Sequence, residues 1–262
     1  MSSATRLEIL SKLPSSPQNA PPVLFVHGGW CGAWCWAERF LPYFASCGFA
    51  AHALSLRGHG ASEPASRPDY ADVLDYVADV ERAIEHLSCD PVLVGHSMGG
   101  FVLQHYLGRH SAPATVLMAS VPHRGLSWRT MLAIARRGMP LSGKAPGASA
   151  VHSLAEVLFE RPPADDVLAR YHGLLSAESW RACAEMLGAR LPRPGWVETP
   201  MLVLAAGSDR ILSPAEMYGM AHAYKADIEV VPQIGHVMML DAGWERAARS
   251  IVAWLSKRLA RA

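Results

Sequence analysis

Short apolar runs alternate with longer amphipathic stretches along most of the chain. The short runs are nearly continuous in apolar residues, which is typical of strands buried on both faces of a sheet. Their alternation with helical stretches predicts an α/β fold, in which a mostly parallel sheet is flanked by helices on both sides. The predicted strands cover residues 23–26, 49–54, 92–94, 115–118, 201–205 and 228–231.

The clearest predicted helix covers residues 71–87. Its apolar residues recur at spacings of three and four, which places them on one face of a helix. A second helix is expected directly after the third predicted strand, over residues 98–110. The apolar face of the first helix consists of Val73, Val77, Val80, Ile84 and Leu87.

The alternation is interrupted between residues 123 and 194. This region holds no convincing strand, and its helical patterns are separated by proline and glycine in "MPLSGKAPGA", "RPPADD" and "LPRPGW". The helical patterns are "SWRTMLAIARRGM", "SLAEVLFE", "DDVLARYHGLL" and "ESWRACAEMLGARL". The sequence therefore predicts a helical insertion between two strands of one sheet.

Composition and charge narrow the class of protein. The 262 residues are 50% apolar and carry a net charge of +1, with no run of Lys and Arg. This balance argues against nucleic acid or an anionic membrane surface as the main partner. No stretch approaches the roughly 18 apolar residues of a membrane span, and we identify no signal peptide, so we expect a soluble, cytoplasmic protein. The odd number of cysteines, five, favours reduced thiols.

The third predicted strand runs into the sequence Gly95-His96-Ser97-Met98-Gly99. A strand followed by G-x-S-x-G and a helix forms a tight turn that exposes the serine hydroxyl, with glycines where side chains would collide. The N–H groups that open the helix favour negative charge at the same place. Ser97 is therefore a candidate nucleophile, and the N–H of Met98 a candidate donor to an oxyanion.

Another strand ends upstream in "VLFVHGGW", where His27 is followed by two glycines. Glycines at this place let a backbone N–H approach the serine from the other side. We expect Gly29 N–H to be the second oxyanion donor, with Trp30 N–H as the alternative. His27 is expected to have a structural role, because a better candidate for the base lies elsewhere.

Two polar residues follow the last two predicted strands. Asp209 follows one in "MLVLAAGSDRILSP", and His236 follows the other in "IEVVPQIGHVMML". Carboxyl ends of parallel strands gather at one edge of a sheet, so Ser97, Asp209 and His236 are expected to meet there. In such a set the histidine takes the serine proton and the carboxylate orients the histidine.

Two other carboxylates compete with Asp209 for the role of the acid. Asp227 precedes its strand, at the wrong end of the sheet for this site. Asp241 is expected to be a cap or first-turn acid of the helix that follows His236. The strand over residues 115–118 is followed by Ala-Ser-Val, with no carboxylate. Asp209 is therefore the predicted acid.

With these motifs the chain resembles the α/β-hydrolase superfamily, and the serine esterases and lipases with a helical cap in particular. The resemblance extends from "VLFVHGGW" through "SLRGHGAS" and "VGHSMGG" to "GSDRILSP" and "GHVMML". It implies a core of residues 1–122 and 195–262, a helical cap over 123–194, and hydrolysis without a cofactor or a metal. His59 is expected to brace its loop, and the first, antiparallel strands to be short or partly missing.

The predicted activity is that of a serine carboxylesterase acting through an acyl-enzyme on a small to medium apolar ester. A thioester or lactone would suit the same oxyanion chemistry. Large apolar residues of the cap are expected to contribute to an apolar pocket. The sequence leaves the oligomeric state open, a homodimer included. The residues expected to bind substrate are Trp30, Trp128, Phe159 and Trp180.

Several alternatives share this set of residues. Hydroxynitrile lyases typically carry a lysine directly after the catalytic histidine, where this chain has Val237. Proline iminopeptidases need acidic groups in the cap, and the sequence does not place Glu156, Glu178 or Glu185 in the pocket. Carbon–carbon bond hydrolases use the same three residues and are a further alternative. A hydrolase-fold receptor that slowly hydrolyses its ligand would show the same residues.

Overall fold

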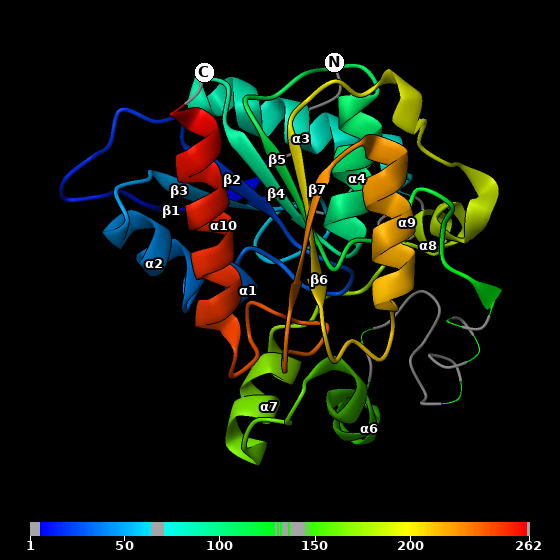
Figure 1. The fold of residues 1–262 in the computed structure, drawn as a ribbon. Coiled ribbons are helices and arrows are strands. Elements are labelled where there is room, and N and C mark those ends of the chain that lie inside the picture. The colour runs from blue at the N-terminus through cyan, green and yellow to red at the C-terminus, as the bar shows by residue number, and fades with distance from the viewer. Residues whose placement is uncertain are drawn as a thin grey trace.

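The computed structural model describes residues 6–63, 71–128, 130, 132, 136, 145 and 147–260. Its centre is a seven-stranded sheet with the order β1-β3-β2-β4-β5-β6-β7 (Figure 1). All neighbouring strands are parallel except β1 and β3. The strands are β1 (Glu8–Lys12), β2 (Val23–Val26), β3 (Ala51–Ser55), β4 (Val92–His96), β5 (Thr115–Met118), β6 (Met201–Ala206) and β7 (Asp227–Val231).

All six predicted strands are present, which confirms the α/β fold class. The strand expected over 49–54 begins two residues later, at Ala51, and β4 extends to His96. The antiparallel strand β1 was not predicted from its own residues. It is a half-exposed edge strand of mixed polarity, "EILSK", and its pairing with β3 rather than its composition defines it.

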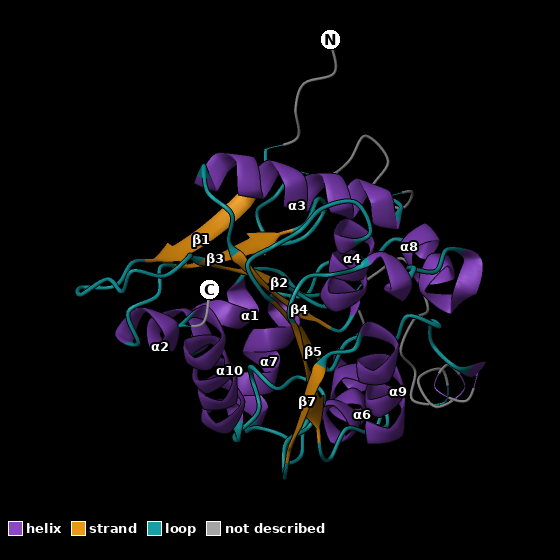
Figure 2. Ribbon diagram, turned by 45° about the horizontal axis from the view of Figure 1, so that its top comes forward, coloured by secondary structure: helices purple, strands orange, loops and turns teal. Residues whose placement is uncertain are grey.

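Helices cover both faces of the sheet and form two hydrophobic layers (Figure 2). On one face α1, α2 and α10 pack against strand side chains such as Phe25, and α1 contributes the buried Trp36 to this layer. On the other face α3, α4 and α9 pack over Leu24, Leu93 and Val203. The helices are α1 (Trp34–Ala37), α2 (Phe40–Ser46), α3 (Val73–Leu87), α4 (Met98–Leu107), α9 (Pro214–Tyr224) and α10 (Trp244–Leu259).

Local sequence signals define where two of these helices begin. Asp72 caps α3, with a reciprocal capping box that involves Asp75. Ser213 caps α9 in the same way with Glu216, and Pro214 occupies the first turn. Such boxes satisfy backbone N–H groups that have no partner within the helix. The helix predicted over residues 71–87 therefore begins at Val73, two residues later than expected.

The helical insertion lies between β5 and β6 in the chain. Its helices α6 and α7 are placed beyond the carboxyl end of β6 in Figure 1. The helical pattern expected over 127–139 falls largely outside the described residues. The division into a core and a cap stays a prediction. The described elements are α6 (Ala148–Leu158), α7 (Asp165–Gly173), α8 (Trp180–Ala184), a π-helical turn η2 (Glu185–Ala189) and a 3₁₀ turn η3 (Pro194–Trp196).

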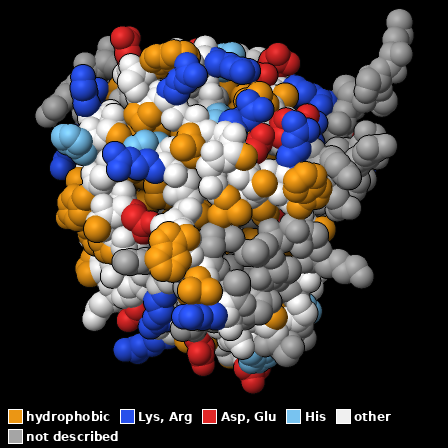
Figure 3. Space-filling view, turned by 90° about the vertical axis from the view of Figure 1, so that its right-hand side faces the viewer, with side chains coloured by type: hydrophobic (Ala, Val, Ile, Leu, Met, Phe, Trp, Pro, Cys, Tyr) orange, Lys and Arg blue, Asp and Glu red, His pale blue; other side chains and the backbone are white. Residues whose placement is uncertain are grey.

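The surface carries mixed charges. On the face shown in Figure 3, acidic and basic side chains lie near one another, in keeping with the net charge of +1. In the described part of the chain, no helix combines the length and the apolar character needed to cross a membrane. The five cysteines are free thiols, as their odd count predicts.

Candidate active site

Ser97 occupies a sharp turn between β4 and α4. Its φ of 49° lies in the left-handed region, which a residue with a side chain rarely adopts. The flanking glycines allow this close turn: a Cβ on Gly95 would lie 2.7 Å from the Cα of Gly100, and one on Gly99 would collide with the carbonyl oxygens of Val26 and His27. The turn therefore has the geometry predicted from the G-x-S-x-G motif, with the serine at its tip.

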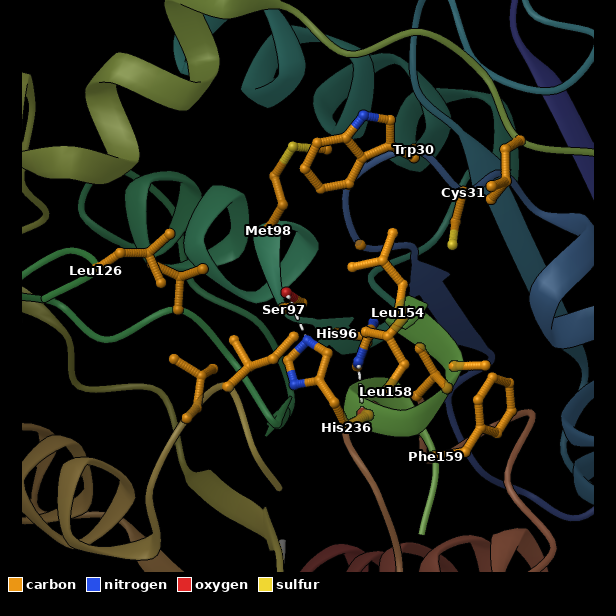
Figure 4. Close-up of a pocket in the computed structure, with 18 of the residues that line it drawn as sticks. Trp30, Cys31, His96, Ser97, Met98, Leu126, Leu154, Leu158, Phe159 and His236 are labelled. Carbon is orange, nitrogen blue, oxygen red and sulfur yellow. Dashed lines mark hydrogen bonds between the residues drawn. The ribbon is translucent and has the colours of Figure 1, made fainter. Parts of the chain in front are cut away.

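The three predicted polar residues meet at the carboxyl edge of the sheet. His236 Nε2 lies 3.1 Å from Ser97 Oγ, and His236 Nδ1 lies 2.8 Å from Asp209 Oδ2. Figure 4 shows the first of these hydrogen bonds at the wall of a cavity. Because a carboxylate only accepts, Nδ1 carries a proton and Nε2 is left to accept the serine proton. The geometry is that required for activation of a serine hydroxyl.

Asp209 is fixed through its other oxygen. Oδ1 accepts hydrogen bonds from the N–H groups of Ile211 at 2.7 Å and Leu212 at 2.9 Å, and the side chain is 1% exposed. Asp227, the first competitor, accepts a hydrogen bond from the Trp254 indole at the far end of β7. Of the three carboxylates weighed, Asp209 is the one in contact with His236.

Asp241 differs from its expected place. It is not a cap or first-turn acid of α10, because that helix begins at Trp244 with Gly243 before it. Its Oδ1 accepts a hydrogen bond from Gly243 N–H at 2.9 Å, directly before the helix, and its Oδ2 accepts from the N–H groups of Gly235 at 3.1 Å and Glu160 at 2.8 Å. Asp241 thus joins the loop before His236 to the helical insertion.

A second histidine holds the loop of His236. His96 Nε2 lies 2.9 Å from the carbonyl oxygen of His236, which can only accept, so Nε2 carries the proton. Burial lowers the pKa of His96 well below its ordinary value, with a further contribution from His236. The neutral His96 ring therefore ties the end of β4 to the loop that carries His236.

The two candidates for the second oxyanion donor, Gly29 N–H and Trp30 N–H, differ in their hydrogen bonds. Trp30 N–H donates a hydrogen bond to Glu178 Oε2 at 3.2 Å, so it is engaged away from Ser97. Gly29 N–H has no acceptor among the described residues, and both Gly29 and Met98 line the same cavity as Ser97. Met98 N–H opens α4, where a helix leaves its first N–H groups without internal partners. The geometry favours Gly29 over Trp30 as the partner of Met98.

His27 has a structural position, as expected. Its Nε2 accepts a hydrogen bond from Leu56 N–H at 3.0 Å, and its Nδ1 faces the carbonyl of Gly28 at 2.7 Å. Burial, with a contribution from charged His59, lowers the pKa of His27 to about 3. The neutral ring therefore braces the end of β2 and does not contact Ser97.

A largely apolar cavity of about 150 Å³ adjoins Ser97 and His236 (Figure 4). The insertion supplies much of its wall through Leu154, Leu158 and Phe159. An apolar cavity of about this size holds a benzene-sized molecule. The site therefore has room for a compact apolar group beside the serine.

Two of the four residues predicted to bind substrate line this cavity, namely Trp30 and Phe159. Trp128 is 70% exposed and Trp180 is 46% exposed, and neither is among the lining residues. Their apolar character suggested a wall position, but their side chains lie toward the surface. That part of the prediction is not supported by the structure.

Among the residues that the structure describes, no group of three or more His, Cys, Asp or Glu side chains is placed to hold a metal ion. The three acidic residues of the insertion that could bind a substrate amine, Glu156, Glu178 and Glu185, do not line the cavity.

Comparison with known proteins identifies the family. A model of the alpha/beta hydrolase family matches residues 23–249, so the chain belongs to the alpha/beta hydrolase family. A monoacylglycerol lipase of Mycolicibacterium smegmatis is 25% identical over 236 residues, which cover 82% of this chain and 81% of that protein. A non-heme chloroperoxidase of Kitasatospora aureofaciens is 33% identical over 105 residues, 38% of this chain and 37% of its own.

Solved structures show the same fold. An esterase from Exiguobacterium antarcticum superposes with a TM-score of 0.77 at 17% identity, covering 96% of each chain. A thermophilic esterase from Thermogutta terrifontis gives a TM-score of 0.74 at 24% identity, covering 97% of this chain and 94% of that one. At these identities the likeness concerns the fold alone.

Sequence reasoning did not place two polar groups that support the site. Glu178 contacts residues that are 102, 119 and 148 positions away, and no local pattern signals such contacts. His96 directly precedes Ser97 in the sequence, but its hydrogen bond to the His236 carbonyl joins residues 140 positions apart. Both contacts depend on how distant loops meet at the edge of the sheet.

Proposed function

We propose that this chain is a serine hydrolase that cleaves a carboxylic ester of a small to medium apolar substrate through an acyl-enzyme. The observation that carries the proposal is the hydrogen-bonded series Ser97–His236–Asp209, with distances of 3.1 and 2.8 Å, beside an apolar cavity. Membership of the alpha/beta hydrolase family and the monoacylglycerol lipase among the relatives support it.

The proposed reaction begins with transfer of the Ser97 proton to His236 Nε2. The serine oxygen attacks the ester carbonyl carbon, and the carbonyl oxygen becomes an oxyanion that accepts hydrogen bonds from Gly29 and Met98 N–H. Collapse of this intermediate breaks the bond to the alkoxy group, which leaves as alcohol with the proton from His236. Water then repeats the sequence on the acyl-enzyme and releases the acid.

The cavity supports the choice of an apolar substrate. Its walls offer few polar partners, so a charged or strongly polar acyl group would be desolvated without compensation. A cavity of about 150 Å³ suits a compact or short acyl group, with the alcohol part extending away from it. Thioesters and lactones present the same carbonyl to Ser97 and belong in the same assay.

We further propose that the insertion over 123–194 acts as a cap that forms the substrate pocket. Leu154 and Leu158 of α6 line the cavity beside Ser97 and His236 (Figure 4). Val237, which stands where hydroxynitrile lyases carry a lysine, also lines the cavity. An apolar side chain there favours the hydrolase over the lyase.

The experiment is a panel of p-nitrophenyl esters, a thioester, a lactone and an amide, assayed on the wild type and Ser97→Ala. Loss of one member of a serine triad lowers kcat by several orders of magnitude, and the folded state should remain. A fluorophosphonate should add its mass to the Ser97 peptide alone. Turnover unchanged in Ser97→Ala, or labelling at another residue, would refute the proposal.

A further inference from the structure

A buried carboxylate of the insertion contacts the turn that carries Gly29. The Glu178 side chain is 0% exposed, and its Oε2 accepts hydrogen bonds from Trp30 N–H at 3.2 Å and from His59 Nε2 at 3.2 Å. Its Oε1 accepts from Tyr76 Oη at 2.8 Å and from Ser179 N–H at 2.9 Å. All four partners act as donors, which fits a carboxylate that accepts at both oxygens.

His59 is charged in this arrangement. Its Nε2 faces Glu178, and its Nδ1 lies 3.1 Å from the carbonyl oxygen of Arg57. Both partners can only accept, so both ring nitrogens must carry protons. Burial acts to lower the pKa of His59, but the Glu178 carboxylate outweighs it and the pKa is raised. The same contact, against the cost of burial, lowers the pKa of Glu178.

The turn that Glu178 contacts is strained. Cys31 N–H donates to the Gly28 carbonyl at 3.3 Å, which closes a four-residue turn, and Trp30 within it has a φ of 59°. This position is normally occupied by glycine, and a residue with a side chain pays roughly 1–2 kcal/mol there. Such a conformation persists only where its surroundings hold it.

The insertion holds the Trp30 backbone on both sides. Besides the bond from Trp30 N–H to Glu178, the Trp30 carbonyl accepts a hydrogen bond from Ser176 N–H at 2.8 Å. If the bond to Glu178 were lost, Trp30 could relax to a negative φ. That relaxation turns the neighbouring peptide groups, including the one that presents Gly29 N–H to the cavity.

We propose that Glu178, paired with His59, is a positioning residue for the oxyanion hole: it fixes the turn over residues 28–31 so that Gly29 N–H points at the developing oxyanion. The insertion then does more than wall the pocket, because it completes the catalytic geometry. This inference rests on the proposed function, in which Gly29 and Met98 stabilise the intermediate. A misplacement of about 1 Å in such a group costs roughly 10²-fold in rate.

Two substitutions at Glu178 separate the effect of side-chain length from the effect of charge. Glu178→Asp keeps the negative charge beside His59 but withdraws the carboxylate by one methylene from Trp30 N–H. Glu178→Gln removes the charge but should keep its oxygen toward the two ring and backbone donors, His59 and Trp30. Its NH2 group then faces the Tyr76 hydroxyl, which can turn to accept, and Ser179 N–H, which loses its acceptor. We expect kcat to fall roughly 10- to 10²-fold in Glu178→Asp and to stay within about 3-fold in Glu178→Gln.

Glu185 offers a matched control on the same insertion. It is also buried, and its carboxylate bonds Val73 N–H and Arg190 without contacting the turn over residues 28–31. Glu185→Asp should lower the melting temperature and leave kcat within about 3-fold of wild type. All rates are expressed per Ser97 titrated with a phosphonate, so that unfolded protein does not count as lost catalysis.

A transition-state analogue supplies the second readout. An alkyl trifluoromethyl ketone forms a hemiketal with Ser97. The serine oxygen bonds the ketone carbon, the serine proton passes to His236, and the ketone oxygen becomes the anion. Its Ki should rise in Glu178→Asp by the factor that kcat falls, while the KM of the ester changes little. Loss of packing alone would not couple Ki to kcat in this way.

The outcomes distinguish this inference from the proposed function. Turnover that does not depend on Ser97 refutes the proposed function and the inference with it. Ser97-dependent turnover with normal kcat and Ki in Glu178→Asp refutes only the inference. A Glu178→Gln protein that is more impaired than Glu178→Asp also overturns it, since charge rather than reach would then govern the rate.

Discussion

At the scale of single residues, the site depends on how each polar side chain is held. Asp209 illustrates this, because two backbone N–H groups occupy one carboxylate oxygen and leave the other for His236. A carboxylate fixed in this way selects one tautomer and one orientation of the imidazole. The order Ser97, Asp209, His236 was predicted from sequence, and the structure brings all three into contact.

Asp209→Asn should lower kcat by a factor of roughly 10² to 10⁴, because the amide no longer selects the tautomer that accepts the serine proton. The fold should remain, since the amide oxygen can keep the bonds from Ile211 and Leu212. Steady-state kinetics on a short activated ester, with circular dichroism, provide the measurement.

Asp227→Asn is the control for that substitution. Asp227 bonds the Trp254 indole far from Ser97, so this variant should retain kcat within about 3-fold. A strong loss in Asp227→Asn with a mild effect of Asp209→Asn would contradict the assignment of the acid.

At the scale of elements, the end of α6 is fitted against the loop of His236. Val237 N–H donates to the Leu158 carbonyl at 3.0 Å, and Arg210 Nη1 donates to the Phe159 carbonyl at 3.0 Å. Gly235 permits this contact, because a Cβ there would lie 2.5 Å from Phe159 C and Glu160 N. The insertion therefore contacts both the turn over residues 28–31 and the loop of His236.

Gly235→Ala should lower the melting temperature and kcat together, because the added methyl group must displace the segment after α6 or the histidine loop. Gly219→Ala is the control. Gly219 lies within α9, and a Cβ there would meet nothing within 4 Å, so this change should stabilise by about 0.5–1 kcal/mol. Thermal melts and ester kinetics test both. A Gly235→Ala protein as stable and active as wild type would show that the contact is not tight.

Phe159→Leu should move the preference toward longer acyl chains, since it enlarges the cavity beside Ser97. One buried methylene is worth about 0.8 kcal/mol, so kcat/KM should change roughly 4-fold per methylene over the homologous series. Trp128→Leu alters a side chain outside the cavity and should keep the wild-type profile. If Trp128→Leu shifted the profile and Phe159→Leu did not, the wall of the acyl site would be placed elsewhere.

At the scale of the whole molecule, the sheet carries two apolar layers and several buried histidines. Burial lowers the pKa of His27 to about 3 and that of His105 to about 4, and that of His96 well below its ordinary value. These groups stay neutral in the folded protein but gain protons when it unfolds in acid. His59 opposes this trend, because its raised pKa means that the folded state holds its proton more tightly.

Stability should therefore fall between about pH 7 and about pH 5. The unfolded chain binds more protons in that range, because burial lowers the pKa of five histidines, His52 and His123 included, whereas the pKa of His59 is raised. The free energy of unfolding therefore decreases as the pH drops. Urea midpoints at the two pH values provide the measurement. An equal urea slope is the control that the same surface unfolds. A higher midpoint at the lower pH would contradict the expectation.

The sequence by itself determined the features that short-range patterns encode. Continuous apolar runs located β2 and β5–β7, period-3.6 spacing located α3, and paired glycines located the turn at Ser97. These signals work because backbone sterics and burial on both faces act within a few residues. Asp209 and His236 each follow a strand in the sequence. The rule that parallel strands end at one edge of the sheet then predicted that both would meet Ser97.

Only the tertiary structure decided which distant groups meet. The pairing of β1, the engagement of Trp30 N–H by Glu178, and the place of Asp241 between the histidine loop and the insertion all join segments far apart in the chain. Trp128 looked like a pocket residue because it is large and apolar, yet it lies at the surface. Burial and hydrogen bonding between distant loops depend on how the insertion docks on the sheet, and no local pattern encodes that docking.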